Sequence, residues 1–356
     1  LKTRTRFGWV SSTFSLVLLL AFWFLGGFPY LDAIIRRFVP TGWAESTIVL
    51  GLCYVGALVV LRLVVSLPFR IYSTFVIEER FGFNRTTPRT FVMDIIKVLC
   101  LTALLGGPLF AAVLALFQHA GTYAWIYCWG VSAAFTLLIQ FIAPRWIMPL
   151  FNKFEPLEND ELREAIEDYA EQVDFPIEGV YEMDGSRRSS KSNAFLAGFG
   201  RNKKIALFDT LIERHTVPEL VGVIAHEIGH YKKKHVLKGT VLGIIELGVI
   251  FYLLSLFIES PGLYRAFGFE AGNMPMRLYV GFVLFGLLYS PVKLVLSVLV
   301  NAFSRHNERE ADRFALETTG RPDDLAEALK KLSRDNLSNL TPHPLTVSLE
   351  YSHPPV

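Results

Sequence analysis

The chain has 356 residues, of which 52% are hydrophobic and 19% are charged, and its formal net charge is +2 at pH 7. A soluble domain has about 25% charged residues, and here the mean hydropathy is +0.37. The apolar residues are concentrated in separate blocks, so the composition excludes an ordinary soluble protein and indicates a membrane protein. The small net charge does not favour nucleic-acid binding, and three cysteines without C-x-x-C spacing support neither a disulfide framework nor a thiolate metal site.

Six segments are long and apolar enough to cross a bilayer, which takes roughly 17–25 residues. They are residues 12–28, 46–67, 95–117, 125–143, 236–258 and 279–300. The first segment has a polar flank and is followed by too many further spans to be a cleaved signal peptide. We therefore expect a mainly α-helical, polytopic fold with six spans in this chain.

Lysine and arginine are concentrated in the loops on one side of these spans. That side receives Lys2, Arg4, Arg6, Arg70, Arg80, Arg85, Arg89, Arg145, Lys232, Lys233, Lys234 and Lys238, whereas the other side receives only Arg36, Arg37, Arg265 and Arg277. Because loops rich in lysine and arginine stay in the cytoplasm, we expect the first side to be cytoplasmic. The long polar region after the fourth span lies on that side.

The polar region 145–235 has the pattern of a small α/β unit. Asn159 and Asp160 are expected to cap an amphipathic helix, and β-like stretches follow at 179–183, 192–197 and 204–208. A second helix is expected to start at the capping box T-V-P-E, residues 216–219. It meets no proline before Pro261, so we expect it to continue into the fifth span.

Residues 225–235 have the sequence A-H-E-I-G-H-Y-K-K-K-H. Histidines four residues apart share one face of a helix, so the ring nitrogens of His226 and His230 can converge on one metal ion. Glu227 can then take a proton from a water that zinc activates at neutral pH. Chance is the alternative, and it produces H-E-x-x-H in roughly one chain of this length per hundred. The spacing therefore favours a catalytic site with one zinc ion per chain.

A catalytic zinc needs a third protein ligand, and N-E-R-E-A-D at 307–312 supplies candidates. His230 and Glu308 both lie on the order of 10 Å beyond the same membrane face if the helices rise 1.5 Å per residue. An antiparallel pair of the fifth and sixth spans then brings Glu308 to the level of His230, which predicts Glu308 as the third ligand. Asp312, one turn further, is predicted to orient a ligating histidine. A charged helix surface is the alternative explanation, and the matched levels favour the ligand.

Two charged residues fall inside the last two spans. Glu246 and Lys293 lie at matching depth, roughly 23 Å from the metal, where charges are costly unless they are paired or hydrated. We therefore predict that they form a buried pair or line a water-filled cavity. The lysines at 232–234 are expected to anchor the helix at the headgroups, and His235 is expected to face away from His230.

Six motifs occur in a fixed order along nearly the whole chain. They are E-E-R-F-G-F-N-R at 78–85, R-S-S-K-S-N-A-F at 188–195, L-F-D-T-L at 207–211, A-H-E-I-G-H at 225–230, N-E-R-E-A-D at 307–312 and S-H-P-P at 352–355. In this order they resemble the motifs of the type I CAAX prenyl proteases, integral-membrane zinc metallopeptidases of the gluzincin group. H-E-x-x-H alone is a moderate signal, whereas the ordered series is specific.

The resemblance implies roles for individual residues. In that family the two motif histidines and the glutamate of N-E-x-E-A-D bind zinc, which corresponds to His226, His230 and Glu308 here. The motif glutamate, Glu227, corresponds to the general base.

The resemblance also implies substrate contacts. Asn193, with Ala194 beside it on a stretch suited to pairing with an extended peptide, corresponds to a residue that contacts substrate near the scissile bond. His353 corresponds to a histidine that stabilises the tetrahedral oxyanion, an interaction worth several kcal/mol. The family fold is a barrel of seven transmembrane helices around a chamber, so the first helix is expected to be absent from this chain, and a small cytosolic α/β metalloprotease domain carries the metal.

The expected domains are residues 1–144, with four spans and a cytosolic loop, and residues 145–356, a zinc metallopeptidase domain that includes the last two spans. The expected function is endoproteolytic cleavage near the C-terminus of prenylated CAAX proteins at a bacterial inner membrane or the endoplasmic reticulum, with a peptide or protein substrate, the lipid bilayer and no nucleic acid as partners. Membrane-protein quality control by the same chemistry is the alternative. A transporter with a structural zinc fits less well, because structural zinc sites are closed by four protein ligands.

Overall fold

The computed structural model describes residues 2–43, 45–199, 202–269 and 277–355, with the backbone only at positions 199 and 202. Within these ranges six helical segments are long and apolar enough to cross a membrane: Lys2–Phe24, Thr47–Glu78, Pro88–His119, Gly121–Leu150, His235–Phe257 and Leu278–Thr319. The six predicted spans are therefore confirmed, and most of the helices extend beyond their apolar blocks.

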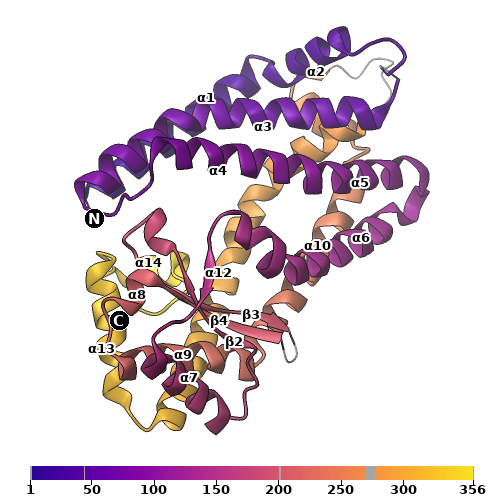
Figure 1. The fold of residues 1–356 in the computed structure, drawn as a ribbon. Helices are drawn as coiled ribbons and strands as arrows, with labels where there is room; N and C mark the ends of the chain where they lie inside the picture. Colours follow the sequence, from indigo (N-terminus) through magenta and orange to yellow (C-terminus); the bar gives the residue numbers. More distant parts are fainter. Residues whose placement is uncertain (1, 44, 200–201, 270–276, 356) are drawn as a thin grey trace.

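The first four spans form the N-terminal half of the chain. They comprise α1 (Lys2–Phe24), α3 (Thr47–Tyr72), α4 (Pro88–Leu101), α5 (Gly107–His119) and α6 (Ala124–Ile142), with α2 (Gly27–Phe38) connecting α1 to α3. Short π-helical turns continue α3 at Ser73–Glu78, join α4 to α5 at Thr102–Gly106 and continue α6 at Ala143–Ile147. In Figure 1, α1 and α3 run side by side, and the chain then returns through α4 and α5.

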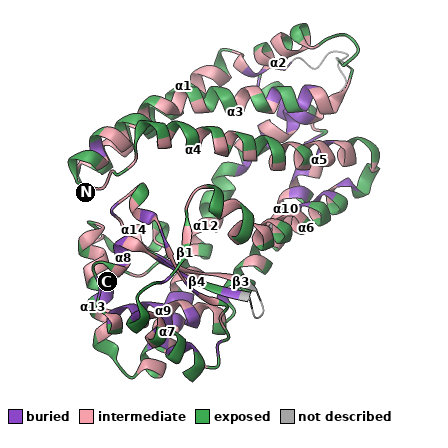
Figure 2. Ribbon diagram, in the orientation of Figure 1, coloured by how far each residue is buried: buried purple, intermediate pink, exposed green. Residues whose placement is uncertain are grey.

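The surfaces of the spans carry large apolar side chains that no other described part of the chain covers. Figure 2 shows exposed and intermediate residues along most of α1, α3 and α4. Exposed positions include Trp9 in α1, Val60 in α3 and Leu138 in α6. An apolar surface of this extent is stable only in contact with lipid, so the protein is an integral, multi-pass membrane protein.

The spans pack most tightly at the end remote from the sheet. Here Tyr54, Leu114 and Tyr279 are almost fully buried, and they belong to one cluster with α10 and α12. Buried Asp32 of α2 pairs with Arg36 at 3.2 Å and with Arg277. These ion pairs and the Tyr279 hydroxyl tie α2 to the start of α12.

The polar region folds as an α/β unit around a four-stranded sheet. The strands are β1 (Phe154–Pro156), β2 (Gly179–Met183), β3 (Ala194–Phe199) and β4 (Asn202–Phe208), in the order β1-β2-β4-β3, and β2 and β4 are parallel. The three predicted stretches correspond to β2, β3 and β4. Strand β1 was not predicted, because its three residues include a proline and have no alternating pattern.

Helices cover this sheet and complete the domain core. They are α7 (Asp160–Gln172), α8 (Asp209–Ile212), α9 (Val217–Lys232), α13 (Pro322–Asp335) and the end of α12 (Leu278–Thr319), with the short helices α11 (Pro261–Ala266) and α14 (Pro344–Glu350) at the surface. Asn159 caps α7 as predicted, since its side chain accepts from the Leu162 N–H at 3.0 Å. Leu162, Ile166, Ile205 and Ile224 are fully buried in one core.

The helix that carries residues 225–235 does not continue into the fifth span, so that prediction is wrong. Helix α9 ends at Lys232, and α10 (His235–Phe257) starts after a break. The break occurs because Lys234 adopts the left-handed conformation, with φ of 59°. This conformation costs a non-glycine residue roughly 1–2 kcal/mol, and no proline or glycine in the sequence marks it. The break turns the chain and changes the direction in which His235 points.

Candidate functional site

Helix α9 is fixed at its N-terminus and along its length before it reaches the histidines. Thr216 and Glu219 form the predicted capping box, in which the Glu219 carboxylate accepts from the Thr216 N–H at 2.9 Å. Glu219 also pairs with Lys331 of α13 at 2.6 Å. Leu220 and Ile224 lie in the domain core, so α9 is a rigid support for His226 and His230.

Gly229 allows α12 to approach α9 closely. A Cβ atom at this position would lie 3.1 Å from both the Cα and the carbonyl oxygen of Ala311. Backbone atoms cannot move aside as a flexible side chain can, so a Cβ atom here would push α12 away from α9. The close approach brings the buried Glu308 of α12 against the histidine face of α9.

The three predicted ligands lie together. The Nε2 atoms of His226 and His230 are 3.0 Å apart, and the two Glu308 oxygens lie 3.4 Å from His226 Nε2 and 3.5 Å from His230 Nε2. Donors about 2.1 Å from a tetrahedral metal are separated by about 3.4 Å, so this group has the spacing of a metal site. Within the described ranges it is the group of histidines and acids suited to hold an ion.

The electrostatics of the site favour a cation. Burial lowers the pKa of His226, but the hydrogen bonds to Asp312 and Glu308 outweigh it and raise the pKa to about 10. Burial raises the pKa of Glu227, an effect that the neighbouring His226 and His230 partly offset. The site therefore stabilises positive charge next to a carboxyl group of raised basicity.

Each histidine has a further partner at its Nδ1 atom. His226 Nδ1 lies 2.9 Å from the Asp312 carboxylate, where the sequence placed Asp312. His230 Nδ1 lies 3.1 Å from His235 Nδ1, and His235 Nε2 lies 3.0 Å from the Glu310 carboxylate.

The prediction that His235 faces away from His230 is wrong. It assumed an unbroken helix, on which residues five apart point in different directions. The left-handed residue between α9 and α10 instead turns the buried His235 side chain onto His230. The contacts from His230 to His235 and from His235 to Glu310 depend on this turn, so they could not be predicted from the sequence.

The C-terminal segment brings His353 to the same site. Its Nε2 atom lies 3.4 Å from a Glu308 oxygen, while 71% of the side chain is exposed. The segment is held by Arg305, which donates to the carbonyl oxygens of Val347 at 3.0 Å and Tyr351 at 2.6 Å. Arg305 was not predicted from the sequence, although its position one turn before Glu308 on the same helix was a usable signal.

Asn193 and Ala194 lie at the edge of the sheet. Among the described strands β3 pairs with β4 alone, so its other side is an edge of the sheet, and it packs against α9. Asn193 is exposed, and its backbone carbonyl accepts from the Phe208 N–H at 3.0 Å. Its side-chain amide makes no hydrogen bond with the described residues. An exposed amide next to a free strand edge is suited to contact an extended peptide.

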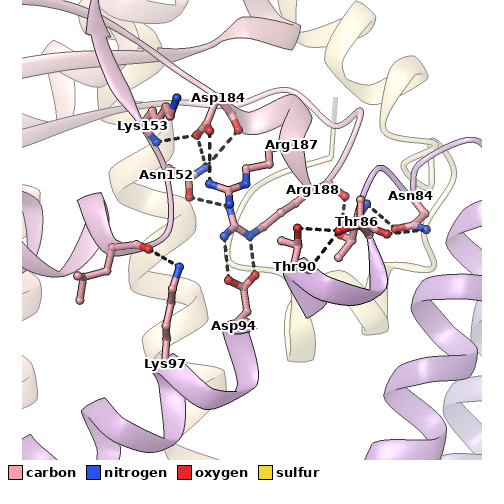
Figure 3. A network of polar contacts seen from close by, with 12 residues as sticks. Asn84, Thr86, Thr90, Asp94, Lys97, Asn152, Lys153, Asp184, Arg187 and Arg188 are labelled. Atoms are coloured by element: carbon pink, nitrogen blue, oxygen red, sulfur yellow. Dashed lines mark hydrogen bonds and ion pairs between the residues drawn. The ribbon is translucent and has the colours of Figure 1, made fainter. Parts of the chain in front are cut away.

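The segment before β3 is clamped to the membrane helices. Arg188 donates to both carboxylate oxygens of Asp94 in α4, at 2.7 and 2.9 Å, and its carbonyl oxygen accepts from Arg85 and Thr86. Figure 3 shows this network between α4, the 84–86 segment and the loop that carries Arg188. The loop between the second and third spans therefore positions the edge strand.

The predicted buried pair of Glu246 and Lys293 is not formed. No ion pair within the described ranges joins them, and Lys293 is exposed while Glu246 is half-buried. Matching depth along two helices does not determine whether two side chains face each other, because rotation about each helix axis also matters. The alternative, that they line a hydrated cavity, stays a prediction.

Two family models match the chain. The model "CAAX prenyl protease N-terminal, five membrane helices" matches residues 1–153, and the model "Peptidase family M48" matches residues 156–356. The chain is also 40% identical over 318 residues to CAAX prenyl protease 1 homolog of Oryza sativa subsp. japonica, covering 88% of this chain and 73% of that one. It is 36% identical over 366 residues to the probable CAAX prenyl protease 1 of Schizosaccharomyces pombe. This alignment covers 99% of the present chain and 75% of the yeast protein.

A solved structure agrees with these matches. The crystal structure of S. mikatae Ste24p superimposes with a TM-score of 0.93 at 34% identity, covering 99% of this chain and 84% of that one. The similarity thus includes both the spans and the α/β unit. The chain belongs to peptidase family M48, among the CAAX prenyl protease 1 homologues, and is a membrane metalloendopeptidase.

Proposed function

We propose that the metal is a single zinc ion held by His226, His230 and Glu308, and that the enzyme cleaves near the C-terminus of prenylated CAAX proteins. The observation that carries the site is the convergence of three donor atoms from two helices within 4.8 Å. Two imidazoles and one carboxylate are a known donor set of catalytic zinc. When bound, zinc lowers the pKa of a coordinated water and polarises the substrate carbonyl.

Glu227 is the proposed general base. Its neighbours on α9 are the two histidine ligands, and burial raises its pKa. A carboxylate of raised pKa accepts a proton more readily near neutral pH. Glu227 therefore takes the proton of the attacking water and can pass it to the leaving amine.

His353 is the proposed oxyanion donor. Its Nε2 atom lies at the site, and its Nδ1 atom lies 2.9 Å from the Ser352 hydroxyl. With Nδ1 accepting from that hydroxyl, Nε2 carries the hydrogen and donates to the oxygen that develops negative charge. Removing one such donor typically costs about 2.7–4 kcal/mol at the transition state.

Asp312 and His235 are proposed to orient the two imidazole ligands. A ring that offers Nε2 to the metal carries its hydrogen on Nδ1, which then donates to Asp312 from His226 and to His235 from His230. His235 accepts at Nδ1, so its hydrogen is on Nε2 and is donated to Glu310. Each ligand is thus held in one tautomer by a carboxylate, directly or through one further ring.

The substrate is proposed to bind as an extra strand at the edge of the sheet. The free edge of β3 supplies backbone groups, and Asn193 and Ala194 lie at its start. Sequence-independent backbone pairing suits an enzyme that acts on the C-termini of different proteins. The prenyl chain is proposed to enter a chamber between the spans, as the family fold implies.

The site is proposed to face the cytoplasm, and residues 1–144 and 145–356 are proposed as the two domains. The orientation rests on the excess of lysine and arginine in the loops near the α/β unit. The relatives named CAAX prenyl protease support the substrate class.

The test is cleavage of a farnesylated CAAX peptide by the purified protein, with an unprenylated peptide as a control. We expect cleavage of the farnesylated peptide, loss of activity with a chelator, recovery with zinc, and no activity for Glu227→Gln despite bound zinc. Equal cleavage of both peptides would contradict the requirement for a prenyl group. An active Glu227→Gln enzyme would contradict the assignment of the base.

A further inference from the structure

A cavity of about 470 Å³ lies between α4 and the loop that follows β2, and none of the proposed metal ligands lines it. It is lined by Arg89, Thr90, Met93, Asp94, Lys97 and Arg187. Figure 3 shows this region, with Asp94 and Lys97 on the helix and Arg187 on the facing loop. Its volume is within the range of ligand pockets in proteins, about 300–1,000 Å³.

The carboxylate in the cavity is already neutralised. Both oxygens of Asp94 accept from Arg188, which does not line the cavity. Asp184, the other acid nearby, accepts from the Lys153 N–H at 2.8 Å and the Asn152 amide at 3.1 Å. It lies 3.9 Å from Arg187, too far for a hydrogen bond.

The cations that line the cavity are incompletely paired. Arg89 makes no hydrogen bond or ion pair with the residues that the structure describes and is exposed. Lys97 donates to the Leu150 carbonyl oxygen at 2.7 Å, which uses one of its three N–H groups. Together with Arg187 and with Arg188, which lies beside the cavity and is paired with Asp94, the described residues supply four cations and two carboxylates here, so two positive charges have no counter-ion among them.

The cavity lies at the beginning of a helical segment that is long and apolar enough to cross a membrane. It extends over the first three turns of α4, which begins the span Pro88–His119. On the same turns Val92, Met93 and Ile96 are exposed by 52%, 43% and 46%. Uncompensated positive charge and exposed apolar side chains thus occur at the same level, and an amphiphilic anion satisfies both.

We propose that this cavity binds the headgroup of an anionic phospholipid. The phosphate and any carboxylate of the headgroup pair with Arg89, Arg187 and the free N–H groups of Lys97, and an acyl chain lies along the exposed face of α4. Basic pockets beside membrane helices bind anionic headgroups in this way. Because Arg188 joins this cavity to the segment before β3, a bound lipid braces the edge strand against α4.

The experiment is a lipid titration of the purified full chain in non-ionic detergent, followed by native mass spectrometry. The probes are phosphatidylserine, phosphatidylcholine and inorganic phosphate alone. We expect the wild type to retain phosphatidylserine in preference to phosphatidylcholine. Removing each positive charge should weaken phosphatidylserine binding about 5-fold, so the double variant Arg89→Gln/Arg187→Gln should bind it on the order of 30-fold more weakly.

The matched control is Arg80→Gln/Arg145→Gln. Both arginines are exposed, lie near the same ends of the spans and do not line the cavity. The control should bind phosphatidylserine as the wild type does. Equal losses in the two double variants would show a diffuse surface charge and overturn the proposal. Unchanged binding in the cavity variant would overturn it, and so would inorganic phosphate that displaces phosphatidylserine at equal concentration.

Discussion

The role proposed for His235 makes a quantitative prediction about zinc affinity. His235→Phe keeps an aromatic ring in the buried position but removes both ring nitrogens. The Nδ1–H of His230 then loses its acceptor in a site where only 21% of the His230 side chain is exposed. An unsatisfied buried donor costs about 1–3 kcal/mol. That corresponds to about 5–150-fold in affinity, in agreement with the 10–100-fold typical of residues that orient a metal ligand.

The assay is competition for zinc between the purified protein and a chelator of known affinity. We expect His235→Phe to bind zinc about 10–100-fold more weakly. The activity of this variant should recover in part at saturating zinc, because Glu227 and His353 are unchanged. His235→Gln, whose amide supplies both an acceptor and a donor, should retain most of the affinity.

The control uses the same substitution at His306, which lies 4.0 Å from Glu310 with 62% of its side chain exposed. His306→Phe should bind zinc as the wild type does. Wild-type zinc affinity in His235→Phe would refute the reasoning, since it would mean that the His230 ring is held without this partner. A loss of the same size in His306→Phe would also refute it.

Three further predictions concern the supports of the site. Gly229→Ala should lower the thermal unfolding temperature and the zinc affinity. Overpacking between α9 and α12 costs about 1–3 kcal/mol, whereas the higher helix propensity of alanine returns about 1 kcal/mol. A variant as stable as the wild type would contradict the close approach of the two helices. Arg305→Met should lower kcat at least tenfold with unchanged zinc affinity, because it releases the segment that carries His353; a change in zinc affinity alone would contradict this. Glu219→Gln should lose about 1–3 kcal/mol of stability at pH 7. Burial opposes ionisation of Glu219, but the hydrogen bonds from Lys331 and Thr216 and the positive charge of Lys331 together outweigh it and hold the pKa of Glu219 below its ordinary value, so this contribution is lost as the pH falls through that lowered pKa. Denaturant unfolding at pH 7 and below pH 4.5 measures the free energies of unfolding of the wild type and the variant. A difference between the two proteins that is equal at both pH values would contradict this prediction.

The sequence by itself determined the class of protein and the donor atoms of the site. The length and spacing of apolar blocks gave six spans, since a bilayer of fixed thickness requires helices of a certain length. Helical periodicity placed His226 and His230 on one face, and the rise per residue placed Glu308 at their level. The spans and the shared face of the two histidines depend on local geometry alone, whereas the level of Glu308 was predicted by assuming that the last two spans pack antiparallel.

Only the tertiary structure decided which side chains meet around those atoms. The turn at Lys234 brings His235 onto His230, and its left-handed conformation has no signal in the sequence because a lysine occupies it. The same limit applies to Glu246 and Lys293, whose depth could be predicted but whose direction could not. Axial position follows from counting residues, whereas the rotation of a helix and the path of a loop depend on contacts between segments distant in the chain.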